Sequence, residues 1–193
     1  MRVGILGGTF DPIHLGHLAA ARAAMECAHL DRVLFIPTGV PPHRPGTVAA
    51  AEQRVEMCRL AIEDEERFEV SPIEVRRKGK SYTVDSLREL RKRYPNDELF
   101  LILGWDAAKL LSSWHEPDEV RRLARLIVVT RPGSGSPATT SEVLCERATP
   151  DISGSALRAA IRRGEPMTDR LPEQVAEYIA KHGLYRDNRQ VGC

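Results

Sequence analysis

Features that would place this 193-residue chain among zinc, redox, nucleic-acid or membrane proteins are missing from its sequence. The four cysteines form no CxxC pair, so neither a zinc site nor a redox motif is indicated. A formal net charge of +1 lacks the basic excess that a general nucleic-acid surface usually carries. The longest apolar run, Leu99–Leu103, is far too short to cross a membrane. Cys27, Cys58, Cys145 and Cys193 are far apart, and helical patterns around the first two predict small core residues.

Targeting segments, internal repeats and linkers are also lacking. The chain runs from its first residue straight into an apolar segment, which leaves no room for a signal peptide, and we therefore expect a reducing, cytoplasmic location. A chain of this length buries about 70% of the surface that its unfolded form exposes, enough for a substantial core. We expect one domain over residues 1–193.

The most informative stretch present is GGTFDPIHLGH, from Gly7 to His17. It follows an apolar run, Val3–Leu6, typical of a short buried strand, and precedes apolar residues at helical spacing. The two glycines let the backbone approach a ligand closely and leave their N–H groups free for an anion. His14 and His17 lie three apart at the start of the helix, where backbone donors and the helix dipole favour negative charge. The stretch therefore predicts a phosphate site.

Two other interpretations of this stretch are weaker. A plain glycine turn followed by two unrelated histidines does not account for the added Thr9 and Asp11-Pro12, because each further position makes a chance match rarer. Asp11 can accept hydrogen bonds that keep the loop in one shape. A zinc site at His14 and His17 lacks a third and a fourth ligand nearby.

GGTFDPIHLGH resembles the signature of the nucleotidyltransferases with a His-x-Gly-His motif, distant relatives of the class I aminoacyl-tRNA synthetases. This version is similar to that of the bacterial nicotinate-nucleotide adenylyltransferases, and LPEQVAEYIAKHGLY extends the resemblance to nearly the whole chain. The resemblance implies a single nucleotidyltransferase domain that joins the AMP moiety of ATP to nicotinate mononucleotide in NAD biosynthesis and releases pyrophosphate. It implies Mg²⁺ held mainly through the ATP phosphates, and no nucleic-acid or membrane partner. Whether the protein is a monomer or a homo-oligomer stays open.

Strands and helices alternate along the rest of the chain. This alternation predicts an open, doubly wound parallel α/β sheet of the Rossmann-like nucleotidyltransferase type, with the loops after its strands meeting at the carboxyl edge. Gly133–Ser141 is rich in Gly, Ser and Pro and predicts a surface loop. Further strands are expected at Arg32–Ile36, Phe68–Val70, Ile73–Val75, Leu99–Leu103 and Leu126–Thr130. Helices are expected over about Ala50–Glu66 and over Pro172–His182, with one more that ends at Tyr94 and another that begins at Pro117.

DISGSALRAAIRRG is a second phosphate candidate. Ser153 or Ser155 caps a helix whose first turns carry Arg158, and a capped surface helix with a solvated arginine would explain these residues equally well. The stretch resembles the family segment I-S-S-T-x-I-R, which favours binding, although Gly154 and Leu157 depart from it. The resemblance implies that His14, His17 and Arg158 are catalytic. It implies that ATP is held by Gly7, Gly8, Thr9, Phe10, His14, His17, Gly104, Asp106, Ile152, Ser153, Ser155 and Arg158.

Three further segments resemble mononucleotide-binding segments of the family. SYTVDSL matches SYT-x-D-T at Thr83 and less closely at Asp85, although Asp85 in a first helical turn also suits the helix dipole. Asp106 in Gly-Trp-Asp is expected either to cap a helix or to hold a ribose hydroxyl. Trp114 is expected either to lie in the core or to stack on the pyridine ring. The resemblance implies a mononucleotide site formed by Thr9, Thr83, Asp85, Asp106, Trp114 and His115, with no protein metal ligand. His43, in the loop after the expected strand Arg32–Ile36, is a further candidate for this site, but a plain solvated loop explains it equally well.

Several rival functions stay open. A sibling enzyme could act on nicotinamide mononucleotide or on phosphopantetheine, but the latter enzymes usually have threonine and asparagine before Gly-His, where this chain has Ile13, His14 and Leu15. A nucleotide-binding regulator without turnover is the rival from another class. A synthetase fragment is disfavoured because no KMSK-type loop is present. The sequence offers no activated serine or cysteine, so we expect no covalent enzyme intermediate.

Overall fold

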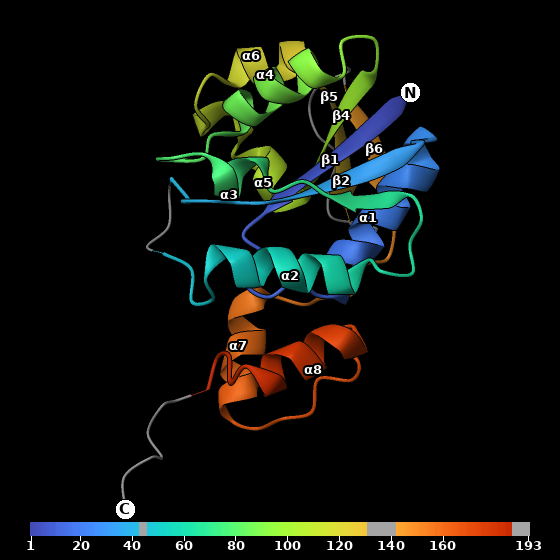
Figure 1. Ribbon diagram of the computed structural model, residues 1–193. Coiled ribbons are helices and arrows are strands. Elements are labelled where there is room, and N and C mark those ends of the chain that lie inside the picture. The colour runs from blue at the N-terminus through green and yellow to red at the C-terminus, as the bar shows by residue number, and fades with distance from the viewer. Residues whose placement is uncertain (43–45, 131–141, 187–193) are drawn as a thin grey trace, which may run out of the picture.

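The computed structural model describes residues 1–42, 46–130 and 142–186, and its strands form one parallel sheet in the order β3-β2-β1-β4-β5-β6 (Figure 1). The strands are β1 (Arg2–Gly8), β2 (Arg32–Pro37), β3 (Phe68–Val70), β4 (Glu98–Gly104), β5 (Arg125–Thr130) and β6 (Glu142–Glu146). Every neighbouring pair is parallel. The expected doubly wound, Rossmann-like fold is confirmed.

The central strands β1 and β4 are apolar because helices cover both of their faces. Val3 of β1 pairs with Arg32 on one side and with Leu99 on the other. All five residues of Leu99–Leu103 are buried, as the continuous apolar run predicts for an interior strand of a parallel sheet. The chain moves outward from β1 to β3 and then returns to β4, so the order reverses between β1 and β4. Ligands of such sheets bind at this reversal, beyond the carboxyl ends of the strands.

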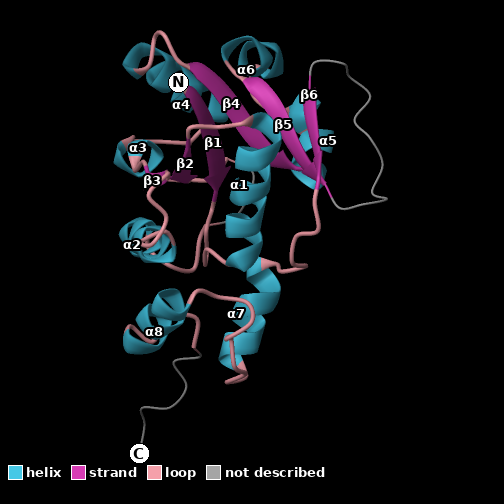
Figure 2. Ribbon diagram, turned by 90° about the vertical axis from the view of Figure 1, so that its right-hand side faces the viewer, coloured by secondary structure: helices cyan, strands magenta, loops and turns pink. Residues whose placement is uncertain are grey.

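Helices lie on both faces of the sheet (Figures 1 and 2). One apolar core joins a sheet face to α1 (Leu15–Ala28) and α2 (Ala51–Ala61), and the other joins the opposite face to α4 (Thr83–Arg93) and α6 (Pro117–Leu123). α7 (Gly154–Arg162) and α8 (Glu173–Lys181) lie beyond α2 and extend the first core. The short helices are α3 (Ile73–Arg76), α5 (Trp105–Lys109) and the 3-10 helix η1 (Leu111–Ser113).

Two predicted segments differ from the structure. Ile73–Val75 is not a strand but belongs to α3, in which buried Glu74 accepts a hydrogen bond from the Ser86 hydroxyl at 2.7 Å. This tertiary contact overrides a local pattern that also fits a strand. The helix predicted to reach Glu66 ends at Ala61, and a turn follows before β3.

The sequence also left one strand and one cysteine pair unrecognised. β6 pairs with β5 beyond the segment predicted as the last clear strand, and it is only five residues long, with a glutamate at each end. It lies next to α1, where Cys145 forms a disulfide with Cys27, 118 residues away in the sequence. The expectation of a plain core residue at Cys27 is therefore wrong, whereas Cys58 is a buried free thiol.

No helix among the described residues has both the length and the apolar character needed to cross a membrane. The predicted surface loop Gly133–Ser141 lies outside the described residues.

Candidate active site

The loop after β1 has an unusual backbone. Phe10 adopts a left-handed conformation, with φ of +47°, and the Asp11–Pro12 peptide bond is cis. The Phe10 ring is buried, and a Cβ at Gly8 would lie only 3.0 Å from it, so glycine suits this position. A Cβ at Gly7 would meet no atom within 4 Å among the residues that the structure describes, its two chain neighbours aside. Protein packing therefore does not require glycine at position 7, and the loop is open on that side.

Asp11 holds the loop from two directions. Its carboxylate accepts hydrogen bonds from the backbone N–H groups of Val48 at 2.8 Å and Ala49 at 3.0 Å, which precede α2. It also accepts the hydroxyl of buried Tyr185 at 2.7 Å. The predicted role of Asp11 as an acceptor that keeps the loop in one shape is confirmed.

Arg54 supports the same loop from α2. Its side chain is fully buried, donating one hydrogen bond to the Thr9 carbonyl at 2.7 Å and another to the Gly39 carbonyl at 3.3 Å. Burial lowers the pKa of the guanidinium, and the Asp11 carboxylate opposes this shift. Arg54 thus ties the loop after β1 to the loop after β2.

His14 and His17 stack on each other at the start of α1. Their ring centroids are 3.7 Å apart at an interplanar angle of 24°, and the rings of Phe10 and His17 form a T-shaped pair with centroids 4.9 Å apart. His14 occupies the N-cap position, and its backbone N–H donates to Nδ1 of His17 at 3.2 Å. Both histidines therefore lie at the helix N-terminus, as their spacing predicts.

Both imidazoles are neutral near pH 7. Burial lowers the pKa of His14 to about 4 and, together with the nearby His14, lowers the pKa of His17 well below its usual value. Because Nδ1 of His17 accepts a hydrogen bond, we assign its proton to Nε2. Nδ1 of His14 is buried without a hydrogen-bond partner in the described part of the chain, which favours the same tautomer. Each ring can then donate an Nε2–H to an anion.

The second predicted phosphate segment lies beside the first. Ser153 is the N-cap of α7 and accepts the Ala156 N–H at 3.3 Å, which decides between the two predicted capping serines. Arg158 reaches across and donates to the Asp11 carbonyl at 2.7 Å. A Cβ at Gly154 would come within 3.3 Å of this guanidinium, so the glycine found here leaves Arg158 room.

The N-termini of α1 and α7 adjoin directly. A Cβ at Gly16, in the first turn of α1, would lie 3.3 Å from the Pro150 carbonyl, which precedes α7. The structure thus brings together His14, His17 and Arg158, three residues that the sequence places in separate segments. Two helix N-termini and one guanidinium form a site suited to several phosphate groups.

Four of the predicted mononucleotide residues form a second group on α4 and the bend before α6. Thr83 and Asp85 lie in the first turn of α4, and Trp114 and His115 lie in the bend between η1 and α6. The ring of His115 lies 4.5 Å from that of Tyr82, the residue before Thr83. The Trp114 side chain is partly buried and packs against the core under α4 and α6. These four predicted residues therefore do lie on adjoining elements.

The remaining predicted residues vary in setting. Gly104 ends β4 and is the N-cap of α5, so Asp106 is not the cap but lies in the first turn, with a 93% exposed side chain paired to Lys109 at 2.8 Å. Ile152 is partly buried against the first core, which includes α1 and α2, and the Ser155 hydroxyl lies 3.3 Å from that of Ser153. His43 lies outside the described residues.

Sequence reasoning missed Arg54 and Tyr185 as supports of the site. A signal existed for Arg54, because it shares the helical face of buried Cys58 and Ala61 by its spacing of four and seven residues. A charged residue on an apolar face needs a partner, which marks it as structural. No such local signal exists for Tyr185, whose partner Asp11 is 174 residues away.

Known proteins resemble this chain over almost its full length. Residues 5–160 match the cytidylyltransferase-like family. A protein of Thermus thermophilus named "Probable nicotinate-nucleotide adenylyltransferase" is 45% identical over 189 residues, covering 96% of this chain and 100% of that protein. A protein of Corynebacterium kroppenstedtii with the same name is 42% identical over 199 residues, covering 100% of this chain and 94% of that protein.

A solved structure shares the fold. Plasmodium falciparum nicotinic acid mononucleotide adenylyltransferase complexed with NaAD superposes with a TM-score of 0.81 at 18% identity, covering 95% of this chain and 97% of that one.

Proposed function

The chain belongs to the family of nicotinate-nucleotide adenylyltransferases, and from this premise we propose that its site joins the AMP moiety of ATP to nicotinate mononucleotide. The observation that carries the proposal is the adjoining N-termini of α1 and α7, with His14, His17 and Arg158 gathered around them. A triphosphate suits such a site because each of these groups donates hydrogen bonds to anions. The products are nicotinate adenine dinucleotide and pyrophosphate.

The reaction needs charge stabilisation more than a protein nucleophile. An oxygen of the mononucleotide 5′-phosphate attacks the α-phosphorus of ATP, and the bond from that phosphorus to the bridging oxygen of pyrophosphate breaks. In our proposal, His14 and His17 hold phosphate oxygens through Nε2–H, Arg158 holds the leaving pyrophosphate, and the backbone of Gly7–Phe10 faces the transferred group. The remaining proposed ATP contacts are the Gly104 backbone, the Asp106 carboxylate on a ribose hydroxyl, and the α7 cap at Ile152, Ser153 and Ser155.

Mg²⁺ is proposed to bind mainly through the ATP phosphates. Within residues 1–42, 46–130 and 142–186, no three His, Cys, Asp or Glu side chains cluster as metal ligands. Mg²⁺ keeps several waters and takes phosphate oxygens readily, so a site with few protein ligands is chemically sufficient. Bound in this way, the ion would neutralise charge on the departing pyrophosphate.

Replacing Arg158 with lysine tests how the leaving group is held. Lysine keeps the positive charge but loses the planar fork, so we expect kcat/KM for ATP to fall about tenfold, the value of one charged hydrogen bond. Steady-state kinetics would measure the change, with Arg162→Lys on the exposed side of the same helix as the matched control. Full activity in Arg158→Lys would mean that a diffuse positive charge is enough.

The choice of substrate is the direct test of the proposed function. We expect kcat/KM to be at least about tenfold higher for nicotinate mononucleotide than for its amide, measured as pyrophosphate release. A carboxylate accepts hydrogen bonds at both oxygens, whereas the NH₂ of the amide cannot accept one. Binding the amide therefore leaves a donor of the pocket unpaired, which costs about 1–3 kcal/mol of binding free energy for each buried group. Thr83 and the backbone of Trp114 and His115 are the proposed donors, with the indole stacked on the pyridine ring.

Two other results would change the proposal. Equal kcat/KM for the acid and the amide would overturn the preference for the acid, and a higher value for the amide would favour the sibling enzyme for nicotinamide mononucleotide. Binding of ATP without release of pyrophosphate with either mononucleotide would favour a non-catalytic nucleotide-binding regulator.

A further inference from the structure

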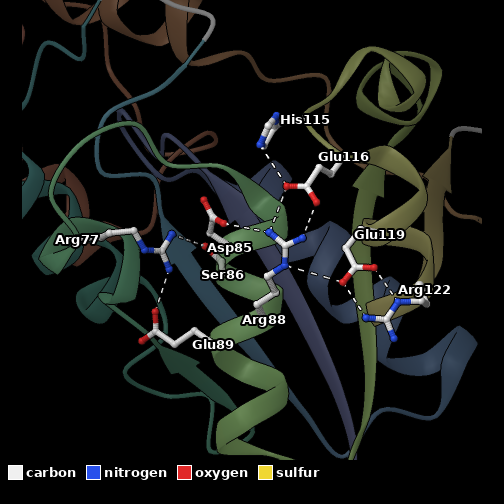
Figure 3. Close-up of polar contacts among 9 residues, drawn as sticks. All are labelled: Arg77, Asp85, Ser86, Arg88, Glu89, His115, Glu116, Glu119 and Arg122. Carbon is white, nitrogen blue, oxygen red and sulfur yellow. Dashed lines mark hydrogen bonds and ion pairs between the residues drawn. The ribbon is translucent and has the colours of Figure 1, made fainter.

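Arg88 links the two segments that carry the proposed mononucleotide residues (Figure 3). It lies in α4, one turn after Asp85, whose carboxylate it contacts at 3.5 Å. Its guanidinium also forms a two-pronged pair with Glu116, with Nη1 3.2 Å from Oε1 and Nη2 bonded to Oε2. One side chain therefore holds both the start of α4 and the residue that ends the Trp114–Glu116 bend.

Glu116 is held in a backbone conformation that glutamate rarely adopts. Its φ is +50°, in the left-handed region, and it is the N-cap of α6 directly before Pro117. A non-glycine residue persists in this region only where its surroundings impose it. Paired with Arg88, Glu116 also contacts Nε2 of His115 at 3.3 Å, so the pair reaches one of the proposed binding residues.

We propose that Arg88 is a positioning residue for mononucleotide binding, acting through Glu116 to set the bend that carries Trp114 and His115 against the start of α4. This inference rests on the proposed function. Arg88 itself is not a catalytic residue. The forked geometry matters, because an exposed pair with a single contact contributes little, whereas a bidentate arginine–carboxylate pair also fixes direction.

Two neighbouring ion pairs do not join α4 to the bend that carries Trp114 and His115. Arg122 pairs with Glu119 at 2.7 Å through both Nε and Nη2, and both residues belong to α6, so this pair joins no two segments, although Glu119 Oε1 also lies 3.8 Å from Nε of Arg88. Arg77 pairs with Glu89 at 2.9 Å on the far side of α4. Arg122→Met therefore removes an arginine from the same cluster and leaves the Arg88–Glu116 pair intact, which makes it the matched control.

Kinetics of the full chain with Arg88→Met, Glu116→Gln and the double variant test the proposal. We expect each single variant to raise KM for nicotinate mononucleotide about fivefold, with kcat and KM for ATP within about twofold of the unmodified protein. The double variant should be no worse than Arg88→Met alone, because removing Arg88 already breaks its pair with Glu116 along with its contacts to Asp85 and Glu119. Arg122→Met should match the unmodified protein.

A second measurement needs no substrate. In a Trp105→Phe background, acrylamide quenching reports only on Trp114, and Arg88→Met should increase quenching whereas Arg122→Met should not. Unchanged quenching and unchanged KM for the mononucleotide in Arg88→Met would overturn the inference, as would equal rises for both substrates or an additive double variant. Failure of the unmodified protein to use nicotinate mononucleotide would instead refute the proposed function, and quenching would still test the positioning.

Discussion

Replacing His17 with alanine is expected to lower kcat by about a hundredfold or more while the protein stays folded. In the proposed mechanism, the neutral His17 ring donates Nε2–H to a phosphate at the N-terminus of α1, where negative charge grows in the transition state. Removal of one such donor typically costs about 3 kcal/mol of transition-state stabilisation, which is more than a hundredfold in rate. Pyrophosphate release at saturating ATP and nicotinate mononucleotide measures the loss.

Two controls separate this loss from damage to the fold. His182→Ala removes an exposed histidine from the end of α8 and should leave the rate unchanged. Thermal unfolding should show that His17→Ala is stable, although its ring also contacts Phe10 and His14. A folded His17→Ala protein with a near-normal rate would refute the phosphate role of the histidine pair.

Replacing Asp11 with alanine is expected to have the largest effect on stability. The change leaves the N–H groups of Val48 and Ala49 and the hydroxyl of Tyr185 without their acceptor, and the last two are buried. Each buried group that loses its partner costs about 1–3 kcal/mol, so the free energy of unfolding should fall by about 3 kcal/mol or more. This is a large share of the 5–15 kcal/mol by which domains are typically stable.

Urea or thermal unfolding measures this effect, with two comparison variants. Tyr185→Phe removes the hydroxyl itself, so no buried group loses its partner except Asp11, which keeps its other donors. The free energy of unfolding should therefore fall by only about 1 kcal/mol. Asp169→Ala removes an aspartate whose side chain is 79% exposed and should change stability by less than about 0.5 kcal/mol. If Asp11→Ala is no less stable than Asp169→Ala, the carboxylate does not hold the loop.

Local patterns predicted the segments that carry their own signals. The apolar run Leu99–Leu103 predicts an interior strand because only a strand covered on both faces is apolar throughout. GGTFDPIHLGH predicts a turn and a helix start because its glycines, proline and histidines each restrict the nearby backbone or the groups at the helix end. Local patterns did not predict two short segments correctly. The pattern of Ile73–Val75 fits either a strand or a helix, and β6 has too few apolar residues to be recognised.

By itself, the sequence indicated the alternation of strands and helices, the doubly wound sheet, and the two helix starts of the candidate phosphate site, since the patterns behind these predictions lie within short stretches of the chain. Only the tertiary structure decided which side chains support them. Arg54 under Thr9, Tyr185 on Asp11, the Cys27–Cys145 disulfide and the Arg88–Glu116 pair all join residues at least 28 positions apart. Such contacts arise when packing of the sheet and helices brings distant segments together, so local spacing can mark a residue such as Arg54 as buried but does not identify its partner.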